Sequence, residues 1–398
     1  MKLMPFVLSA VAAAVAASGA RADVITDWNL KTADLVTEAR LGTPPAIRLM
    51  ALVQTAAHGA VATAPRGASV DAAVAAAHRA VLAKLLPAQL ASIDAAVQPA
   101  LAALPEGAAK AAGIAAGEKA AADVLAQRLD DGVATPEAYR PHAAPGAYVP
   151  TASVAIPQWP QRKPWLMASA SQFRPAAPPA LTGAQWAREY NEVKDFGGRA
   201  STRRNAEQTE VARFWDSSLP NIYYGVVRSV ALQPGRDVMR NARLFAAVAQ
   251  AMDDAMIGVF DAKYHYGFWR PVTAIRNGDA DGNDATARDA AWASLIDAPL
   301  HPEYPSGHSI LAATVATVLK HELGGRAVPV LATSSPTAGG ATPANPTTRR
   351  WADLDGFVRE VSDARIWGGL HFRSATDAGE AMGRRIGELA TRQLTAAR

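Results

Sequence analysis

Apolar residues recur every three to four positions along most of the chain, which is the spacing of amphipathic helices. In the first third, Ser69 is a good N-cap residue and Pro87 suits the first turn of a helix. Short segments rich in Pro and Gly separate the periodic stretches, so we expect antiparallel neighbouring helices. The helices expected in this part cover residues 26–64, 69–85, 87–104 and 110–129.

A long aperiodic segment rich in Pro, Ala, Gln and aromatic residues follows, from 131 to 182. Loops of this length either shape a substrate channel or serve as plain linkers, and both interpretations are open here. Helical spacing returns after Thr182, which together with Gln185 predicts a capping box. The later helices are expected over residues 205–216, 221–232, 240–261, 309–320 and 374–397.

Convincing alternation of the strand type does not occur in the sequence. Residues 328–331 are at most a short edge strand, and the segment 334–348, rich in Pro, Gly and Thr, is expected to be a loop. We therefore predict an all-α protein of two packed helical bundles. The N-terminal bundle covers 23–130, the irregular connection 131–182, and a C-terminal catalytic helical domain 183–398.

The N-terminus has the pattern of a secretory signal peptide over residues 1–22. Met1-Lys2 gives a basic start, an apolar run reaches Ala17, and Ala20-Arg21-Ala22 is a cleavage-type site. This predicts an exported protein, periplasmic or secreted. Lys, Arg, Asp, Pro or Gly interrupts every later apolar run before it reaches membrane length, so no membrane span is expected.

Composition narrows the classes of chemistry and of partner. The chain has no cysteine, which excludes disulfides, thiol catalysis and Cys-ligated metals. The 40 basic residues barely exceed the 36 acidic ones and do not cluster, so no nucleic-acid partner is expected. Of the histidines, His58 and His78 have no acidic or His partner at ligand spacing and are expected to be packing or surface residues.

The block His301-Pro-Glu-Tyr-Pro-Ser-Gly-His308 precedes an apolar helical run. Pro305 and the N-cap residue Ser306 place Gly307 and His308 at a helix N-terminus, where unpaired N–H groups and the helix dipole favour an anion. The Ser hydroxyl can donate to that anion and the His can move a proton. An ordinary turn before a helix is the alternative interpretation of the block taken alone.

Two further blocks carry cations. If the helix before Pro271 is continuous, Lys263 and Arg270 lie two turns apart on one face, among aromatic residues. Two cations on one face repel unless an anion lies between them, although snorkelling or cation–π packing of Arg270 is also possible. Near the C-terminus, Arg365 and His371 precede the helix expected over 374–397.

The loop 277–282 imitates the start of a calcium-binding loop through Asn277, Asp279 and Asp281. The position that needs a bidentate Glu in such a loop is Arg288, which repels a cation. A turn-rich acidic loop is the alternative.

Three blocks in order, Lys-x6-Arg-Pro, Pro-Ser-Gly-His and Arg-x5-His, resemble the signature of the superfamily of vanadium-dependent haloperoxidases and type-2 phosphatidic acid phosphatases. The resemblance implies a site for phosphate or its near-isostere vanadate. Lys263, Arg270 and Arg365 would surround the oxyanion, with Ser306 and the N–H of Gly307 as donors. His371 would bond to the central atom, as the axial ligand of vanadium if vanadate is bound, and His308 would transfer protons.

Two reactions use such a site. A haloperoxidase oxidises halide with hydrogen peroxide at resident vanadate, with Lys263 and His308 assisting. An acid phosphatase cleaves a phosphoester through a phosphohistidine at His371, with His308 as general acid and no cofactor. Phe268-Trp-Arg-Pro271 and the Glu303 to Ser309 stretch look more like the haloperoxidase branch, which makes it the preferred interpretation. A binding protein without turnover is a third candidate, but it would need no proton-transferring His308.

One position departs from the family pattern. The family often has Asp four residues after the axial His, where this chain has Ala375. Asp377 or a backbone carbonyl would then orient the His371 ring. His301 and Glu303 are expected either to tune His308 and the halide pocket or, more simply, to form a turn. We expect the side chains of the three cations, Ser306 and the two histidines to converge on one cavity.

Overall fold

A computed structural model describes residues 23–342 and 345–396, and the predicted signal peptide over 1–22 lies outside these residues. The described part contains thirteen α-helices and one two-stranded sheet, so the expected all-α class is confirmed. The N-terminal helices are α1 (Val24–Glu38), α2 (Thr43–Thr63), α3 (Val70–Leu85), α4 (Leu90–Ala102) and α5 (Ala108–Gln127). The later helices are α6 (Ala184–Gly197), α7 (Ala206–Phe214), α8 (Pro220–Ala231), α9 (Val238–Tyr266), α10 (Pro271–Arg276), α11 (Gly307–Leu323), α12 (Leu354–Trp367) and α13 (Arg373–Ala396). Short 3-10 turns cover Pro87–Gln89, Trp159–Gln161 and Gly278–Ala280.

The N-terminal helices pack closely because small residues line their contacts. A Cβ atom at Gly117 of α5 would stand 2.2 Å from the carbonyl oxygen of Ala73 in α3, so only glycine fits there. The Ser69 hydroxyl caps α3 by accepting from the N–H of Ala72, as the sequence predicts. The stretch expected as one helix over 26–64 is in fact α1 and α2. Arg40, with φ of 51°, lies at the break between them.

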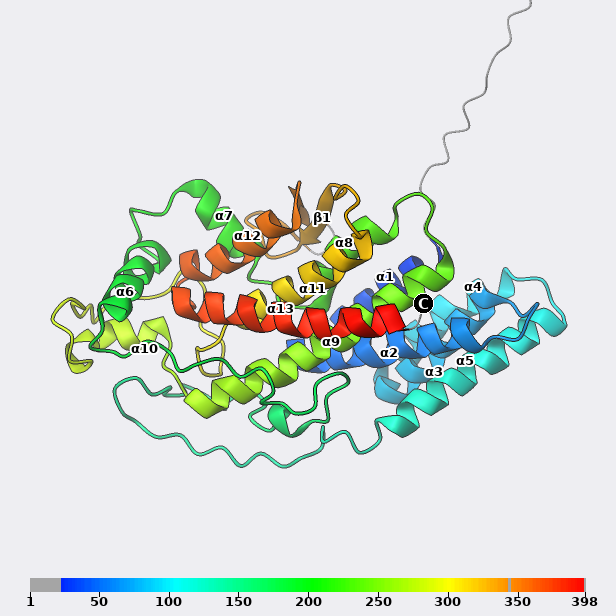
Figure 1. Cartoon of the computed structure of the whole chain (residues 1–398), viewed down its shortest axis with the longest axis horizontal. Helices are drawn as coiled ribbons and strands as arrows, with labels where there is room; N and C mark the ends of the chain where they lie inside the picture. Colours follow the sequence, from blue (N-terminus) through cyan, green and yellow to red (C-terminus); the bar gives the residue numbers. More distant parts are fainter. Residues whose placement is uncertain (1–22, 343–344, 397–398) are drawn as a thin grey trace, which may run out of the picture.

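Helix α9 is the central element, and it packs against α2 on one side and against α11 and α13 on the other. Figure 1 shows α3 to α5 gathered at one end of the molecule and α6 and α10 at the other, with α9 and α13 running between them. One cluster of buried apolar side chains extends from Ile25 to Ala390, and a second, smaller one lies around Trp186, Trp269 and Phe372. The division into two bundles at residue 130 stays a prediction.

The irregular segment between α5 and α6 runs along one edge of the molecule (Figure 1) and is held by buried charges on α9. Arg162 pairs with Asp131 and with Asp253 of α9 at 2.9 and 2.6 Å. The adjacent Asp254 carboxylate accepts three backbone N–H groups, from Trp165 to Met167. These partners satisfy the buried charges and fix the segment against α9.

Two local predictions are wrong. Helix α6 begins at Ala184 after an extended Gly183, so Thr182 and Gln185 form no capping box, and the Gln185 side chain donates to Glu189 instead. The expected loop 334–348 contains part of a hairpin, in which β1 (Leu331–Ser335) pairs antiparallel with β2 (Thr347–Trp351). Strand β2 is Thr- and Arg-rich and largely exposed, so it carries no apolar alternation to reveal it. Among the described residues, no helix combines the length and apolarity that crossing a membrane requires.

Candidate active site

The N-terminus of α11 is built as the sequence predicts. Ser306 is the N-cap, and its hydroxyl accepts from the N–H and, at 3.1 Å, from the hydroxyl of Ser309. Ser362 of α12 lies 3.0 Å from the Ser309 hydroxyl and donates to Glu380 of α13 at 2.7 Å. The hydroxyls thus form a chain that orders the start of α11. Gly307 is open to a cavity, because no atom stands within 4 Å of the position of a Cβ there.

Lys263 and Arg270 meet, but not on one helical face as the sequence predicts. Helix α9 ends at Tyr266 with a left-handed Gly267, and Arg270 precedes α10. The loop 301–305 brings the two cations together. Lys263 Nζ donates to the carbonyls of Pro302 and Glu303 at 3.1 and 2.9 Å, and also to that of Pro305.

Arg270 contacts two histidines, His301 at the start of this loop and His371 of the C-terminal block. Its guanidinium donates to the carbonyl of His301 at 3.0 Å, while Nη2 lies 3.0 Å from His301 Nδ1. Nη1 lies 3.3 Å from His371 Nε2 and donates to the carbonyl of Leu370. Arg270 is only 1% exposed, so its charge is buried and not at the surface.

Arg365 and His308 complete the cluster from α12 and α11. Arg365 donates through Nη1 to the carbonyl of Trp215 at 2.6 Å, and its Nε has no partner. His308 hydrogen-bonds the backbone of Ser217, while its buried Nε2 has no partner. The two buried nitrogen atoms Arg365 Nε and His308 Nε2 are thus available to a further hydrogen-bond partner.

The cluster carries an excess of buried positive charge. Burial lowers the pKa of Lys263 well below its usual value, and the neighbouring Arg270 lowers it further. Burial likewise lowers the pKa of Arg270 and of Arg365 to about 10. In the described part of the chain, these three side chains donate to backbone carbonyls and a histidine instead of to carboxylates. A multiply charged oxyanion is the partner that such a cluster lacks.

Glu303 is the acidic group of the site, and it holds His371. Its Oε1 lies 2.8 Å from His371 Nδ1 and accepts the N–H of Phe372 at 2.9 Å. Burial raises the pKa of Glu303 to about 8, although Arg270 and Lys263 oppose the rise. The expected turn roles of His301 and Glu303 are therefore wrong, because both contact the predicted site residues.

The contacts of His371 fix its tautomer. An arginine N–H only donates, so Nε2 beside Arg270 is the accepting nitrogen and Nδ1 carries the proton towards Glu303. Burial and the charge of Arg270 lower the pKa of His371 well below its usual value, which keeps the ring neutral. An unprotonated Nε2 can bond to the central atom of a phosphate or vanadate.

Asp377 is not the orienting carboxylate. It is exposed on α13, while Glu303 occupies the position next to Nδ1. Sequence spacing pointed downstream of His371 because the family's acidic residue lies there. The one signal for Glu303 was its place as the sole acidic residue of the His301 to His308 block.

Four of the six side chains expected to converge, those of Lys263, His308, Arg365 and His371, line a cavity of about 500 Å³. Its polar end is formed by Lys263, His301, Gly307, His308, Arg365 and His371. Arg270 and Ser306 are buried behind this lining and contact His371 and Ser309. The remaining walls are mainly apolar and come from the start of α2, from α9, α11 and from residues around 155 and 300.

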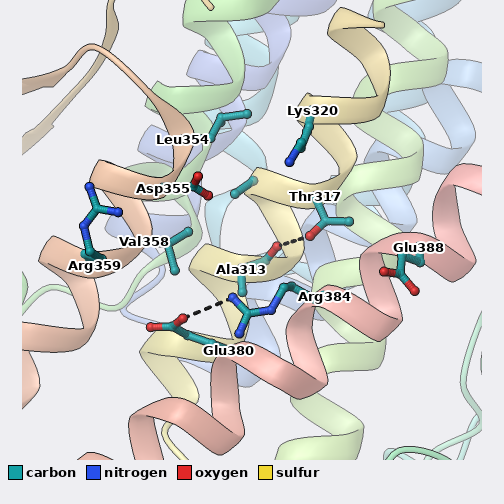
Figure 2. A pocket seen from close by; sticks show the side chains of 11 residues that line it. Ala313, Thr317, Lys320, Leu354, Asp355, Val358, Arg359, Glu380, Arg384 and Glu388 are labelled. Atoms are coloured by element: carbon teal, nitrogen blue, oxygen red, sulfur yellow. Dashed lines mark hydrogen bonds and ion pairs between the residues drawn. The ribbon is translucent and has the colours of Figure 1, made fainter. Parts of the chain in front are cut away.

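A second cavity of about 350 Å³ lies between α11, α12 and α13 (Figure 2). Side chains of both charges line it, and Figure 2 shows Glu380 paired with Arg384. The two side chains approach to 3.2 Å. The predicted site residues do not line it. It is therefore not the candidate active site.

The buried acidic residue of the loop 277–282 is hydrogen-bonded to other side chains of the protein. Asp281 accepts from Trp186 Nε1 at 2.7 Å and from the Thr286 hydroxyl at 2.8 Å. Over the ranges that the structure describes, no three His, Asp or Glu side chains are grouped so that they could hold a metal ion. Asp281 thus anchors α6 to this loop.

The residues present fit a tetrahedral oxyanion such as vanadate. Three buried cations supply the charge, and the unpartnered Arg365 Nε and His308 Nε2 are available. His371 supplies a neutral nitrogen ligand. Ser306 and Gly307 stand at a helix N-terminus, where backbone N–H groups bind anions.

Comparisons with known proteins find a similar domain, a similar sequence and similar structures. Residues 243–397 match the family described as "VCPO second helical-bundle domain". A stretch of 189 residues is 30% identical to the vanadium chloroperoxidase of Curvularia inaequalis. That match covers 40% of this chain, and it spans about a third (31%) of the relative's length.

Solved structures with a similar fold include two bacterial enzymes. A bacterial vanadium-dependent iodoperoxidase superposes with a TM-score of 0.76 at 22% identity, covering 94% of this chain and 97% of that one. The apo form of a bacterial vanadium-dependent chloroperoxidase superposes with a TM-score of 0.73 at 20% identity, covering 90% and 96%. Residues 243–397 thus match the second helical-bundle domain of this family, and the structural likenesses show that the chain has the fold of the bacterial vanadium-dependent haloperoxidases.

Proposed function

We propose that this protein is a vanadium-dependent haloperoxidase, which converts halide, hydrogen peroxide and a proton into hypohalous acid and water. The observation that carries the proposal is the state of His371. Glu303 holds its Nδ1–H, and its unprotonated Nε2 lies among three buried cations. When bound there, vanadate would supply a Lewis-acidic centre that activates hydrogen peroxide towards the halide.

The side chains of this chain have distinct roles in the proposal. Lys263, Arg270 and Arg365 balance the charge of the oxyanion, and the bidentate fork of arginine suits its oxygens. Ser306 and the N–H of Gly307 donate to it from the start of α11. These groups are fixed before the ligand arrives, since backbone carbonyls already hold the cations.

His308 is the proposed proton-transfer residue. It lines the cavity, and its Nε2 has no partner. Burial and the charge of Arg365 lower its pKa well below the usual value, so it rests as a neutral base. A neutral imidazole can accept a proton from hydrogen peroxide and return it to the leaving oxygen.

An acid phosphatase would use the same residues, with His371 as the nucleophile. The haloperoxidase interpretation has the better support, because the named relatives of known sequence or structure are haloperoxidases. The phosphatase reaction serves as the comparison arm of the test.

The test uses the purified chain freed of vanadate, assayed with hydrogen peroxide and bromide or iodide, and in parallel with a chromogenic phosphoester. Halide oxidation that appears only after orthovanadate is added is expected. Ester cleavage that vanadate inhibits, without halide oxidation, would instead assign the phosphatase reaction. His371→Ala is expected to abolish turnover, and activity that survives this change in both assays would contradict the site.

A further inference from the structure

The proposed reaction consumes one proton in each turnover, so the buried site needs a supply of protons. His308 can return to the leaving oxygen only the proton that it accepts from hydrogen peroxide, and this exchange adds none to the balance. Glu303, the acidic group of the site, is 0% exposed and has no direct contact with solvent. A further acidic group, in contact with solvent and connected to the site, would supply the missing proton.

A chain of hydroxyl groups leads from the start of α11 to such a group on α13. Ser309 Oγ donates to Ser306 Oγ at 3.1 Å, and Ser362 Oγ of α12 lies 3.0 Å from Ser309 Oγ. Ser362 Oγ also lies 2.7 Å from Oε1 of Glu380. The four side chains therefore form a continuous hydrogen-bonded path across three helices.

The inner members of this chain are shielded from water, whereas its outer end is not. Ser306, Ser309 and Ser362 are buried. The Glu380 side chain is 17% exposed and lines the second cavity, between α11, α12 and α13 (Figure 2). Arg384 pairs with Oε2 of Glu380, which leaves Oε1 to Ser362. Glu380 is thus placed to take protons from solvent and pass them to a buried hydroxyl.

The two cavities lie on opposite faces of α11. Gly307 and Leu311 line the cavity over the candidate site, whereas Ala313 and Ala316 line the second one. At about 100° per residue, these two pairs project from opposite sides of the helix. Because Ser306 and Ser309 belong to the N-cap and the first turn of α11, the hydroxyl chain connects the two sides at the N-terminus of the helix.

The hydroxyl hydrogens can be aligned for transfer towards the site. Ser362 has one hydroxyl hydrogen, which serves either Glu380 or Ser309, and the hydrogen of Ser309 is directed to Ser306. Within the described part of the chain, Ser306 Oγ accepts from the N–H and the hydroxyl of Ser309 and donates to no protein group. Its own hydrogen is therefore available to an oxyanion.

We propose that Glu380, Ser362 and Ser309 form a relay that carries protons from the second cavity to the oxyanion site through Ser306. The inference rests on the proposed function, whose reaction consumes the proton. Glu380, once protonated by solvent, gives its proton to Ser362 Oγ while each serine passes its own hydroxyl proton to the next oxygen. Ser306 gives its proton to an oxygen of the bound oxyanion. Each serine ends as a neutral hydroxyl, and Glu380 returns to a carboxylate.

The first test separates proton delivery from oxyanion binding. Glu380→Gln keeps an oxygen that accepts from Ser362 but has no proton to give, and Ser309→Ala interrupts the chain inside the core. Both should lower kcat for halide oxidation by about tenfold or more. Calorimetric titration of the vanadate-free chains with orthovanadate should give affinities within a few-fold of the unmodified chain, because Ser306 and the cations remain.

The matched control is Glu388→Gln, which removes a carboxylate from the same helix and the same cavity without touching the hydroxyl chain. It should change neither kcat nor affinity. If vanadate affinity or the melting temperature falls in parallel with kcat in Glu380→Gln and Ser309→Ala, the chain only holds Ser306 in place and the relay is refuted.

The second test locates the entry of the proton. Glu380→Ala leaves room in the second cavity for a small acid in place of the carboxyl group. At constant pH and ionic strength, acetic acid should raise kcat of Glu380→Ala in proportion to its concentration, but should leave kcat of Ser309→Ala unchanged, because that interruption lies inside the core. Equal rescue of both variants, or rescue of neither, would overturn the relay.

Failure of the relay and failure of the proposed function give different results. Unchanged kcat in Glu380→Gln and Ser309→Ala, with halide oxidation by the unmodified chain, would overturn the relay and leave the proposed function intact. Absence of halide oxidation by the unmodified chain with orthovanadate would overturn the proposed function and the relay with it.

Discussion

The Nδ1 atom of His371 lies 2.8 Å from Oε1 of Glu303, and both side chains are almost fully buried. These residues are 68 positions apart in the chain. The contact leaves Nε2 unprotonated, beside Nη1 of Arg270 in the cation cluster. The block proposed to form the anion site therefore also supplies the carboxyl group that positions His371.

We expect Glu303→Ala to lower vanadate affinity by about 10- to 100-fold, because the His371 ring loses the partner that fixes its tautomer. Glu303→Gln keeps an oxygen that accepts from Nδ1–H and should lose less. Calorimetric titration of the vanadate-free chain with orthovanadate measures both. The control is Asp377→Asn, which should leave the affinity unchanged, and a loss there equal to that of Glu303→Ala would contradict this assignment.

His308→Ala should reduce kcat for halide oxidation by about 10²- to 10⁴-fold, the range for loss of a positioned acid/base group. Vanadate affinity should change only a few-fold, since other residues carry the charge that binds it. Steady-state kinetics and the same titration separate the two effects. Exposed His265→Ala serves as the control, and an affinity loss in His308→Ala as large as the loss in kcat would assign His308 to binding.

Gly379→Ala should destabilise the fold by about 1–3 kcal/mol through overpacking. A Cβ there would lie 2.6 Å from the carbonyl oxygen of Ser306, so α13 must move away from the start of α11. Vanadate affinity should fall with it. In contrast, a Cβ atom at Gly59 in α2 would lie 3.4 Å from its nearest neighbour. Gly59→Ala should therefore be neutral or stabilising by up to about 1 kcal/mol. Urea unfolding measures both, and equal effects would contradict the close approach.

We expect the buried His78, which lies outside the candidate site, to make the free energy of unfolding depend on pH. Its Nδ1 bonds the carbonyl of Val74, and burial lowers its pKa from 6.5 to about 4. Between pH 6.5 and about 4, His78 therefore binds a proton in the unfolded chain but not in the folded chain. This contribution to the free energy of unfolding is fully present above pH 6.5 and is lost as the pH falls through 4. At about 1.4 kcal/mol per pH unit, the loss is about 3 kcal/mol.

The check is urea unfolding from pH 7 to pH 4 for the unmodified chain and His78→Phe. The variant should show a pH dependence flatter by about 3 kcal/mol over this range. His142→Phe, on the exposed part of the irregular segment, should keep the full dependence. Parallel curves for all three proteins would refute the role of His78.

Local signals in the sequence predicted most of the fold. The caps Ser69 and Ser306 and the three-to-four spacing depend on residues within one turn of each other, and they are found where expected. The same reasoning failed at Thr182, because Gly183 takes the extended cap conformation, and at β2, whose exposed residues carry no pattern.

The sequence by itself determined the composition of the site: three cations, two histidines and a serine at a helix start, in three blocks. The tertiary structure decided how they are used. Arg270 reaches Lys263 through a loop and not along a helix, and Glu303 replaces Asp377 beside His371. The physical reason is that caps and periodicity act within a few residues, whereas pairing of buried charges depends on which distant segments the core brings together.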